Sequence, residues 1–154
     1  MIGNLRVPLV GSVSSLAEVA SVTPRSLEDV YSEVVAIVVD DALSIDPEAA
    51  KILADAFHHG DAALKALAPE AERVLWPEHF DIGISVDDVN YGLSPGDSAI
   101  AVPYAYVGPW VVREHPFWNA SFGAARELSE FPDVAAIVEF FRAGRAAAAD
   151  GPGR

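Results

Sequence analysis

The chain has 154 residues, a suitable length for one globular domain that buries its own hydrophobic core. It contains 23 acidic and 10 basic residues, and the resulting formal charge of -13 would repel the phosphates of a nucleic acid. It has no cysteine, which excludes disulfides, thiolate zinc sites and cysteine nucleophiles. We therefore expect no nucleic-acid partner.

The sequence also indicates where the protein resides. Residues 1–6 lack a basic segment followed by an apolar stretch, and the longest aliphatic run, residues 34–39, is too short to cross a bilayer. The sequence therefore predicts no membrane segment and a cytoplasmic location, with which the lack of disulfides agrees. No glycine-rich phosphate-binding motif is present, so the sequence leaves any cofactor unknown.

Residues 1–45 give mixed signals. Residues 5–10 alternate in the way of a short edge strand, and Ser14 and Ser15 predict the cap of a short helix over residues 16–22. The density of β-branched residues favours a strand over residues 33–39, although the spacing of the apolar residues there also fits a helix. The sequence does not decide the fold of this segment.

The strongest helix signal lies in the middle of the chain. Asp46, Pro47 and Glu48 form a typical helix start, with the N-cap, the first helical position and an acidic first turn in order. From Ala49 to Leu67 the apolar residues recur at intervals of three and four. The sequence therefore predicts a helix over residues 47–67.

After this helix the apolar period changes to two, which is typical of strands. We predict strands over residues 80–86, 89–93 and 99–107, joined by turns at residues 87–88 and 94–97 into an antiparallel meander. Pro103 would place the last strand at an edge or a bulge of the sheet. In the first strand, bulky residues share one face and small residues the other.

The C-terminal part is expected to be helical. Asn119 predicts the N-cap of a helix over residues 120–128, and Pro132 the start of a final helix. The Ala- and Gly-rich tail, residues 146–154, is expected to fray. The whole is predicted to be a single α+β domain over residues 1–150, an antiparallel β-meander in residues 72–112 packed by three or four helices.

His79 and Asp81 are the residues most suited to catalysis. If residues 79–86 are extended, both side chains lie on the small-residue face of one strand. A histidine oriented by an aspartate can act as a general base, and the pair could supply two metal ligands. No third ligand is evident, so we predict no metal site. The alternative is that His79 has only a structural role beside a turn.

Polar aromatic residues are crowded into residues 75–119, which contain all three tryptophans and three of the four tyrosines. These rings could line a pocket for a flat or moderately apolar small molecule. Alternatively, they could fill the gap between a twisted sheet and its helices. The residues predicted to bind a ligand are Trp76, Asn90, Tyr91, Asp97, Tyr104, Tyr106, Trp110 and Asn119.

Several segments carry a family resemblance: DPEAA at residues 46–50, LWPEHFD at 75–81, NYG at 90–92, SPGD at 94–97, PYAYVGPW at 103–110 and FWN at 117–119. Over residues 44–143 the chain resembles an uncharacterised bacterial protein family with no established activity. The resemblance therefore implies no catalytic residues. Members of that family are longer at the N-terminus and carry extra strands there.

Together these features predict a small-molecule-binding domain, with acid–base chemistry by His79 and Asp81 as a further hypothesis. The alternative is a non-catalytic interaction or assembly module. We also predict a homodimer that pairs through residues 1–40, because the aliphatic run at residues 34–39 and a free sheet edge would otherwise leave apolar surface uncovered.

Overall fold

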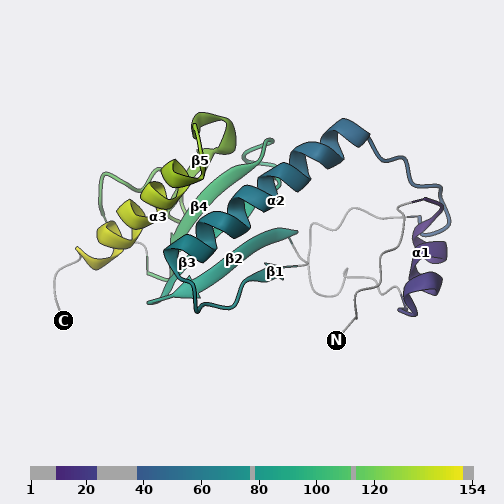
Figure 1. The fold of residues 1–154 in the computed structure, drawn as a ribbon, viewed down its shortest axis with the longest axis horizontal. Coiled ribbons are helices and arrows are strands. Elements are labelled where there is room, and N and C mark those ends of the chain that lie inside the picture. The colour runs from purple at the N-terminus through teal and green to yellow at the C-terminus, as the bar shows by residue number, and fades with distance from the viewer. Residues whose placement is uncertain (1–9, 24–37, 77–78, 112–113, 151–154) are drawn as a thin grey trace. The chain divides into compact units, whose positions relative to one another are not determined.

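The computed structural model describes residues 10–23, 38–76, 79–111 and 114–150. The chain divides into two compact units, residues 1–49 and 50–154. The first contains helix α1 (Val13–Ala20), and the second contains a five-stranded sheet and helix α3 (Val134–Ala149). Helix α2 (Pro47–Leu67) begins just before the boundary (Figure 1). Within the described ranges, no helix is long and apolar enough to cross a membrane.

Helix α1 begins earlier than predicted. Its N-cap is the extended residue Ser12, whose hydroxyl accepts from the backbone N–H of Ser15 at 3.2 Å, while the Ser15 hydroxyl accepts from the N–H of Ser12 at 2.9 Å. This reciprocal pair is a capping box, and it supersedes the cap predicted at Ser14 and Ser15. The predicted strand over residues 5–10 lies outside the described residues except for Val10, which is in no strand.

The strand predicted over residues 33–39 lies mostly outside the described residues, but its last two positions do not support it. Val38 is irregular and Val39 lies in a turn, where the N–H of Asp41 donates to the carbonyl of Val38 at 3.0 Å. Val38 and Val39 therefore lead into a turn and do not form the end of a strand.

Helix α2 confirms the prediction over residues 47–67. Asp46 Oδ1 accepts from the backbone N–H of Glu48 at 2.9 Å, which satisfies one of the free donors at the helix start. The buried residues of the helix are Ala56, Gly60, Ala63 and Leu64, which share one face because Ala56, Ala63 and Leu64 lie three or four residues from Gly60. The middle and end of α2 therefore contribute to the core.

The sheet confirms the predicted antiparallel meander, with the strand order β1-β2-β3-β4-β5. The strands are β1 (Val74–Trp76), β2 (Asp81–Val86), β3 (Val89–Ser94), β4 (Tyr104–Pro109) and β5 (Ala124–Glu127). In the register, Gly92 of β3 lies between Gly83 of β2 and Tyr106 of β4. Strand β4 is an interior strand, so the edge or bulge predicted from Pro103 is wrong; Pro103 lies just before the strand.

Strand β5 replaces the helix predicted over residues 120–128. Asn119 does not cap a helix: its side chain exchanges two hydrogen bonds of 2.9 Å with the backbone of Ala125. Gly123 has a φ of +140°, and a Cβ there would lie 2.1 Å from the carbonyl oxygen of Val107. Pairing with β4 therefore overrides the local helix signal.

Helix α3 starts after the predicted proline and runs further than predicted. Asp133 is the N-cap, accepting from the N–H of Ala136 at 2.9 Å, and the helix continues past Arg145 to Ala149. Residues 146–149, expected to fray, are therefore helical, and Ala147 is 4% exposed. Burial of Ala147 gives this last turn a packing contact that its composition does not reveal.

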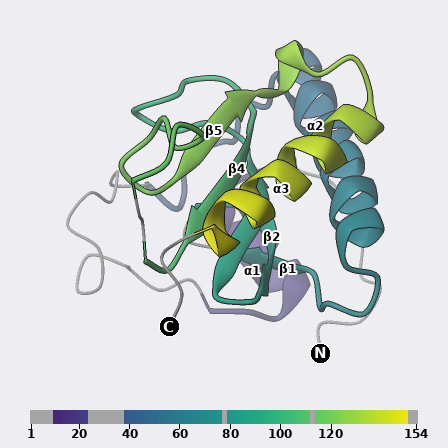
Figure 2. The ribbon, with the colours of Figure 1, turned by 90° about the vertical axis from the view of Figure 1, so that its left-hand side faces the viewer.

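The sheet has two chemically distinct faces. One, the helix-covered face, packs against α2 and α3, which lie on the same side of the sheet in Figure 2. Its core includes Leu64, Ile84, Tyr91, Leu93, Val107, Ile137 and Phe141. Alternate residues of the three central strands point to the other side, which we call the polar face. The polar face consists of Asp81, Gly83, Ser85, Asn90, Gly92, Ser94, Tyr104, Tyr106 and Gly108.

Candidate ligand pocket

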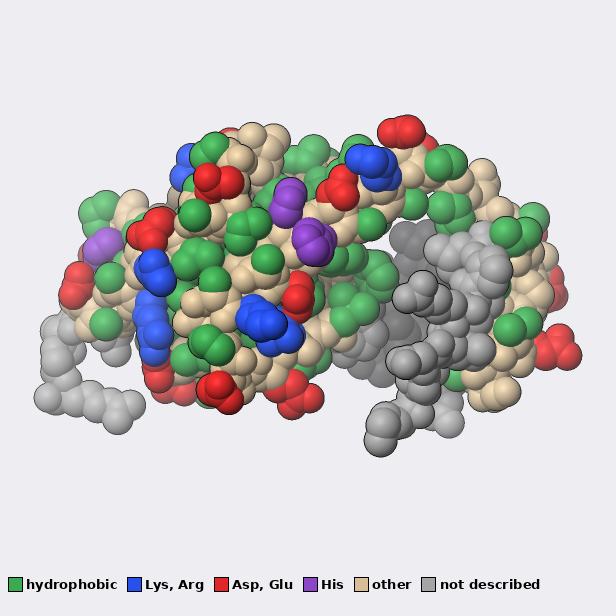
Figure 3. Space-filling model, viewed as in Figure 1, with side chains coloured by type: hydrophobic (Ala, Val, Ile, Leu, Met, Phe, Trp, Pro, Cys, Tyr) green, Lys and Arg blue, Asp and Glu red, His purple; other side chains and the backbone are tan. Residues whose placement is uncertain are grey.

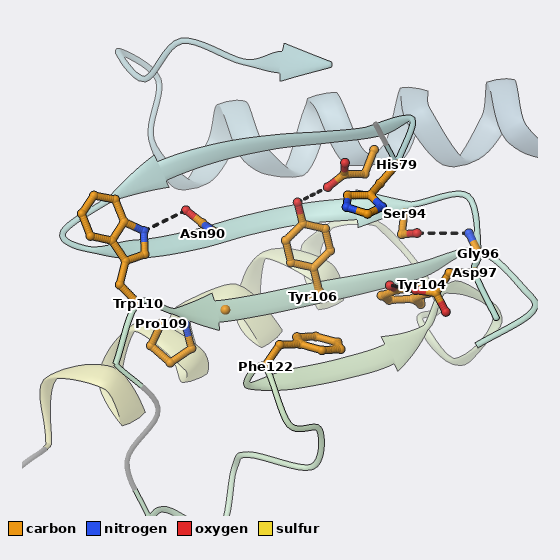
Figure 4. A pocket seen from close by; sticks show the side chains of 12 residues that line it. His79, Asn90, Ser94, Gly96, Asp97, Tyr104, Tyr106, Pro109, Trp110 and Phe122 are labelled. Atoms are coloured by element: carbon orange, nitrogen blue, oxygen red, sulfur yellow. Dashed lines mark hydrogen bonds between the residues drawn. The ribbon is translucent and has the colours of Figure 1, made fainter. Parts of the chain in front are cut away.

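A pocket of about 740 Å³ lies on the polar face, within the second unit (Figure 4). Strands β2, β3 and β4 form its floor, and the loop after β3 and the segment before β5 add to its wall. Its lining residues are His79, Asp81, Asn90, Ser94, Gly96, Asp97, Tyr104, Tyr106, Gly108, Pro109, Trp110 and Phe122.

Tyr106 lies across the sheet because two neighbouring positions have no side chain. A Cβ on Gly92 would be 2.4 Å from the Tyr106 hydroxyl oxygen, and one on Gly83 would be 3.0 Å from it. A side chain at Gly92 would therefore collide with the phenol, and one at Gly83 would force it to shift slightly. The ring therefore reaches from β4 to β2, where its hydroxyl donates to Asp81 Oδ2.

Asp81 is the buried charged group of the pocket. It is 8% exposed, and its second oxygen, Oδ1, is buried and has no hydrogen-bond partner among the described residues. Leaving a buried acceptor unpaired costs on the order of 1–3 kcal/mol, and more for a charged group. Burial, followed by the hydrogen bond to Asp81 and the charge of Asp81, raises the pKa of Tyr106 far above its ordinary value. Tyr106 therefore stays a neutral phenol, and its hydroxyl proton remains in the hydrogen bond to Asp81.

A second carboxylate and phenol pair forms the wall beside this one. The Tyr104 hydroxyl donates to Asp97 Oδ2 at 2.7 Å, and Asp97 Oδ1 accepts from the N–H groups of Ala99 and Ile100 at 2.7 and 2.9 Å. The Tyr104 bond, with these backbone bonds, lowers the pKa of Asp97. Burial and the bond to Asp97 raise the pKa of Tyr104 to about 12. Asp97 is therefore held as a carboxylate that shapes the loop after β3.

The far end of the pocket is organised around Asn90. Its Oδ1 accepts from the Ser85 hydroxyl at 2.7 Å and from the indole N–H of Trp110 at 3.1 Å (Figure 4). Two donors on one oxygen fix the orientation of the amide, because the NH₂ group cannot occupy that position. Trp110 is nevertheless 66% exposed, so one side of its ring is free to contact a ligand.

His79 lies in the pocket wall but not in the geometry predicted for it. Strand β2 begins at Asp81, His79 and Phe80 lie in a turn, and Phe80 has a φ of 53°. The expectation of an extended segment from residue 79 is therefore wrong, because a positive φ breaks the strand alternation there. The partner of Asp81 is Tyr106, and no hydrogen bond joins His79 to Asp81 among the described residues. The charge of His79 contributes to the lowered pKa of Asp97.

Three residues predicted to bind a ligand lie elsewhere. Tyr91 is in the core on the helix-covered face, with its ring centroid 5.8 Å from that of Phe141. Asn119 holds the start of β5. Trp76 does not line the pocket, although it pairs with Asp81 across β1 and β2, and its indole nitrogen is 3.5 Å from the Cβ position of Gly83. The remaining predicted residues lie together in the pocket: His79, Asp81, Asn90, Asp97, Tyr104, Tyr106 and Trp110.

Sequence reasoning missed the small and apolar lining residues, which are Ser94, Gly96, Gly108, Pro109 and Phe122. Phe122 lies in residues 120–128, for which the sequence predicts a helix, so the sequence does not indicate its place in the pocket wall. The alternation of small residues along β2, with Gly83 and Ser85 on one face, was the available signal. The same alternation on β3 and β4 places further small residues on that face, and together they indicate a shallow polar face.

A metal site is not evident in the part of the chain that the structure describes, where no three His, Asp or Glu side chains are grouped to hold an ion. The neighbouring His58 and His59 on α2 are both exposed, with ring centroids 6.1 Å apart. Figure 3 shows two purple histidine side chains next to each other on this side of the molecule. Consecutive helical residues point about 100° apart, so the two side chains diverge. Metal binding therefore receives no support from this pair.

Comparison with known proteins adds no further assignment: no protein-family model, curated protein or solved structure was found to match the chain.

Proposed function

We propose that the second unit binds a small molecule in the pocket on the polar face. The observation that carries this proposal is Asp81, which lines an open pocket and whose buried oxygen Oδ1 has no partner among the described residues. A polar group that is left unpaired within a folded core lowers stability. At a binding site, in contrast, a ligand can supply the hydrogen-bond donor that such a group lacks.

The composition of the pocket supports the proposal. Its volume of about 740 Å³ lies within the range of roughly 300–1,000 Å³ that is typical of small-molecule sites. Aromatic rings from Tyr104, Tyr106, Trp110 and Phe122 provide apolar contact surface. The few polar groups among them are held by hydrogen bonds, so they are fixed before a ligand arrives.

A fragment library screened by NMR tests the proposal. With the backbone amides of the chain assigned, bound fragments are expected to shift the resonances of residues 81–85, 90–97 and 104–110. Gly108→Val should weaken these shifts, because Gly108 lines the pocket and a Cβ there has its nearest neighbour at 3.4 Å, which leaves room for a side chain that occupies part of the cavity. The control Ala135→Val makes the same kind of change on an exposed position of α3.

Two results of this screen would count against the proposal. One is that no fragment shifts these resonances. The other is that the shifts persist unchanged in a folded Gly108→Val protein, since ligands would then be binding elsewhere.

Acid–base chemistry by His79 and Asp81 is proposed as a further property of the same site. Both residues line the pocket, and His79 is exposed and able to exchange protons with a bound molecule. His79→Ala should weaken or abolish fragment binding while changing the free energy of unfolding by about 1 kcal/mol or less. Unchanged binding in the folded variant would remove His79 from the site.

The alternative function, a protein-interaction module, is favoured by one observation. Trp110 and Val111 are 66% and 69% exposed, and such adjacent apolar side chains are suited to contact a partner. A Trp110→Ala variant that binds fragments normally but loses a protein partner would favour this alternative.

We also propose that the chain forms a homodimer through residues 1–40. Val38 and Val39, the described end of the aliphatic run, are 62% and 40% exposed. Pairing would cover such surface, and burial of roughly 800 Å² per partner is typical of a stable interface. Val38→Asp should then split the dimer. Light scattering that reports a 16.3 kDa particle for the unaltered chain at micromolar concentration would contradict the proposal.

A further inference from the structure

We infer that the ligand of this pocket carries a protonated amine on a flat, apolar body, and that the amine is recognised by Asp81 with the oxygens of Tyr106 and Tyr104. The inference rests on the proposed small-molecule function and adds the chemical class of the ligand. It follows from which donors and acceptors of the pocket already take part in hydrogen bonds within the protein.

The two tyrosines have no donor left for a ligand. A phenol has one O–H donor, and its oxygen can also accept. Tyr106 donates to Asp81 and Tyr104 donates to Asp97, so each phenol offers a ligand only its oxygen lone pairs. The oxygens of these two phenols can therefore only accept hydrogen bonds from a ligand, which favours a ligand that donates.

The carboxylates reinforce this preference. Asp97 has its oxygens occupied by Tyr104 and by backbone N–H groups, whereas Asp81 retains Oδ1 without a described partner. No lysine or arginine is among the lining residues, and His79 is the one lining side chain that can carry a positive charge. Two carboxylates against one histidine leave the pocket negative or neutral. A cationic donor satisfies both the charge and the unpaired oxygen.

The aromatic lining favours an organic cation with an apolar body. The Tyr104 and Tyr106 rings are 6.4 Å apart and tilted by 59°, and Trp110 and Phe122 add two further rings to the wall. Aromatic faces attract cations electrostatically and provide flat contact surface for an attached ring. A bare divalent ion would find no group of three metal-binding side chains among the described residues. The lining therefore suits an amine better than a metal ion.

The site must adjust slightly when the amine arrives. Asp81 Oδ1 is enclosed in this structure, so a ligand atom reaches it when a neighbouring side chain rotates. His79 is an exposed lining residue two positions before Asp81, and exposed side chains change rotamer within nanoseconds.

Three probes of similar shape but different charge test the inference: benzylamine, benzyl alcohol and benzoate. Their binding to the full chain can be measured by NMR titration at neutral pH and millimolar concentrations. Benzylamine should bind at least about tenfold more tightly than benzyl alcohol, because a hydrogen bond to a charged group is stronger than one between neutral groups. Benzoate should bind weakest.

The variant Asp81→Asn identifies the responsible group. It keeps the size of the side chain, but it removes the charge, and the tenfold advantage of benzylamine over benzyl alcohol should disappear. Asp55→Asn is the matched control, because it removes one negative charge from an exposed position on α2 and should leave the advantage unchanged. If Asp81→Asn does not fold, the ranking of the three probes on the unaltered chain still decides the inference.

The outcomes separate the ligand class from the proposed function. Equal binding of benzylamine and benzyl alcohol, or tighter binding of benzoate, would overturn the amine inference while leaving a small-molecule pocket. Failure of benzylamine to bind would also overturn the inference, and the fragment screen then decides the proposed function independently. Persistence of the full amine preference in folded Asp81→Asn would show that Asp81 does not recognise the amine.

Discussion

Tyr91 and Tyr106 lie on neighbouring strands of the same sheet, yet the two faces they occupy have opposite designs. Tyr91 lies on the helix-covered face, 1% exposed and packed on Phe141, and its hydroxyl has no partner among the described residues. Tyr106 lies on the polar face, spread over two glycines, with its hydroxyl bonded to Asp81. The first face is built for packing, and the second is built for arranging polar groups.

The contrast shows how a single sheet separates stability from recognition. Alternation of side chains sends bulky residues of β2–β4 toward α2 and α3, so the polar face can keep glycines and an unpaired carboxylate oxygen. Those features would weaken a core, but the helix-covered face compensates for them. We therefore expect substitutions on the two faces to have different consequences for stability and binding.

The largest expected effect is on the helix-covered face. Phe141 is fully buried, so Phe141→Ala should lower the free energy of unfolding by about 3–5 kcal/mol. Phe122→Ala, at a 40% exposed position in the pocket wall, is the control and should cost about 1 kcal/mol or less. Urea unfolding followed by tryptophan fluorescence measures both, because all three tryptophans lie in the second unit. Equal losses would contradict the division between the faces.

The next effect concerns the glycines beneath Tyr106. Gly92→Ala should destabilise the protein by about 2 kcal/mol, because its Cβ would lie 2.4 Å from the Tyr106 hydroxyl oxygen and 2.6 Å from the carbonyl oxygen of Ile82. Gly108→Ala is the matched control on the same face, and its nearest neighbour at 3.4 Å predicts a change within about 0.5 kcal/mol.

A double variant separates the two clashes at Gly92. Tyr106→Ala should recover part of the loss, since it removes the phenol but leaves the Ile82 carbonyl. Strictly additive losses in the double variant would show that Tyr106 does not lie over Gly92.

Replacing tyrosine by phenylalanine should change the free energy of unfolding in opposite directions on the two faces. Tyr91→Phe removes a buried hydroxyl without a described partner and should raise the free energy of unfolding by about 1 kcal/mol. Tyr106→Phe removes the donor to Asp81 and should lower it by about 1.5 kcal/mol. Chemical denaturation of both variants measures the pair, and a shared sign would contradict the assigned hydrogen bonding.

The smallest expected effect concerns the pKa values of Tyr91 and Tyr104, which are raised for different reasons. Burial raises the pKa of Tyr91 to about 12, and burial together with the bond to Asp97 raises that of Tyr104 to about 12, from an ordinary 10.0. Because the folded state holds the neutral phenols, their contribution to stability is present below pH 10 and is lost as pH rises through about 12.

An Asp97→Asn variant distinguishes the two tyrosines by NMR titration of their ring resonances. It should lower the pKa of Tyr104 and leave that of Tyr91 at about 12. A parallel fall in both pKa values would show that the variant loosens the whole fold, and no change at Tyr104 would remove Asp97 as a cause.

Much of the fold could be predicted from the sequence because its signals are local. The cap at Asp46 and the apolar stripe that follows specify α2, and the period of two specifies the meander. Strand β5 could not be predicted in this way, because it depends on pairing with β4 and on the contact of Asn119 with Ala125. Tertiary pairing of this kind leaves no periodic signal in four residues.

The sequence could predict most of the residues that line the candidate site, but not which of them contact one another. The crowding of polar aromatics pointed to most of the lining residues, whereas Tyr91 was placed wrongly because ring chemistry alone does not reveal which face a strand residue occupies. The partner of Asp81 was also missed, since His79 is two residues away and Tyr106 is 25 residues away. Sequence distance favoured the wrong pair.

A crystal structure of the chain soaked with benzylamine tests the recognition of an amine by Asp81 at atomic detail. If Asp81 recognises an amine, density for the probe is expected in the pocket beside Tyr106, with its nitrogen within hydrogen-bonding distance of Asp81 Oδ1 and with the sheet unchanged. A well-ordered structure in which Asp81 Oδ1 is satisfied by a protein donor, and in which the pocket excludes the probe, would contradict the central claim.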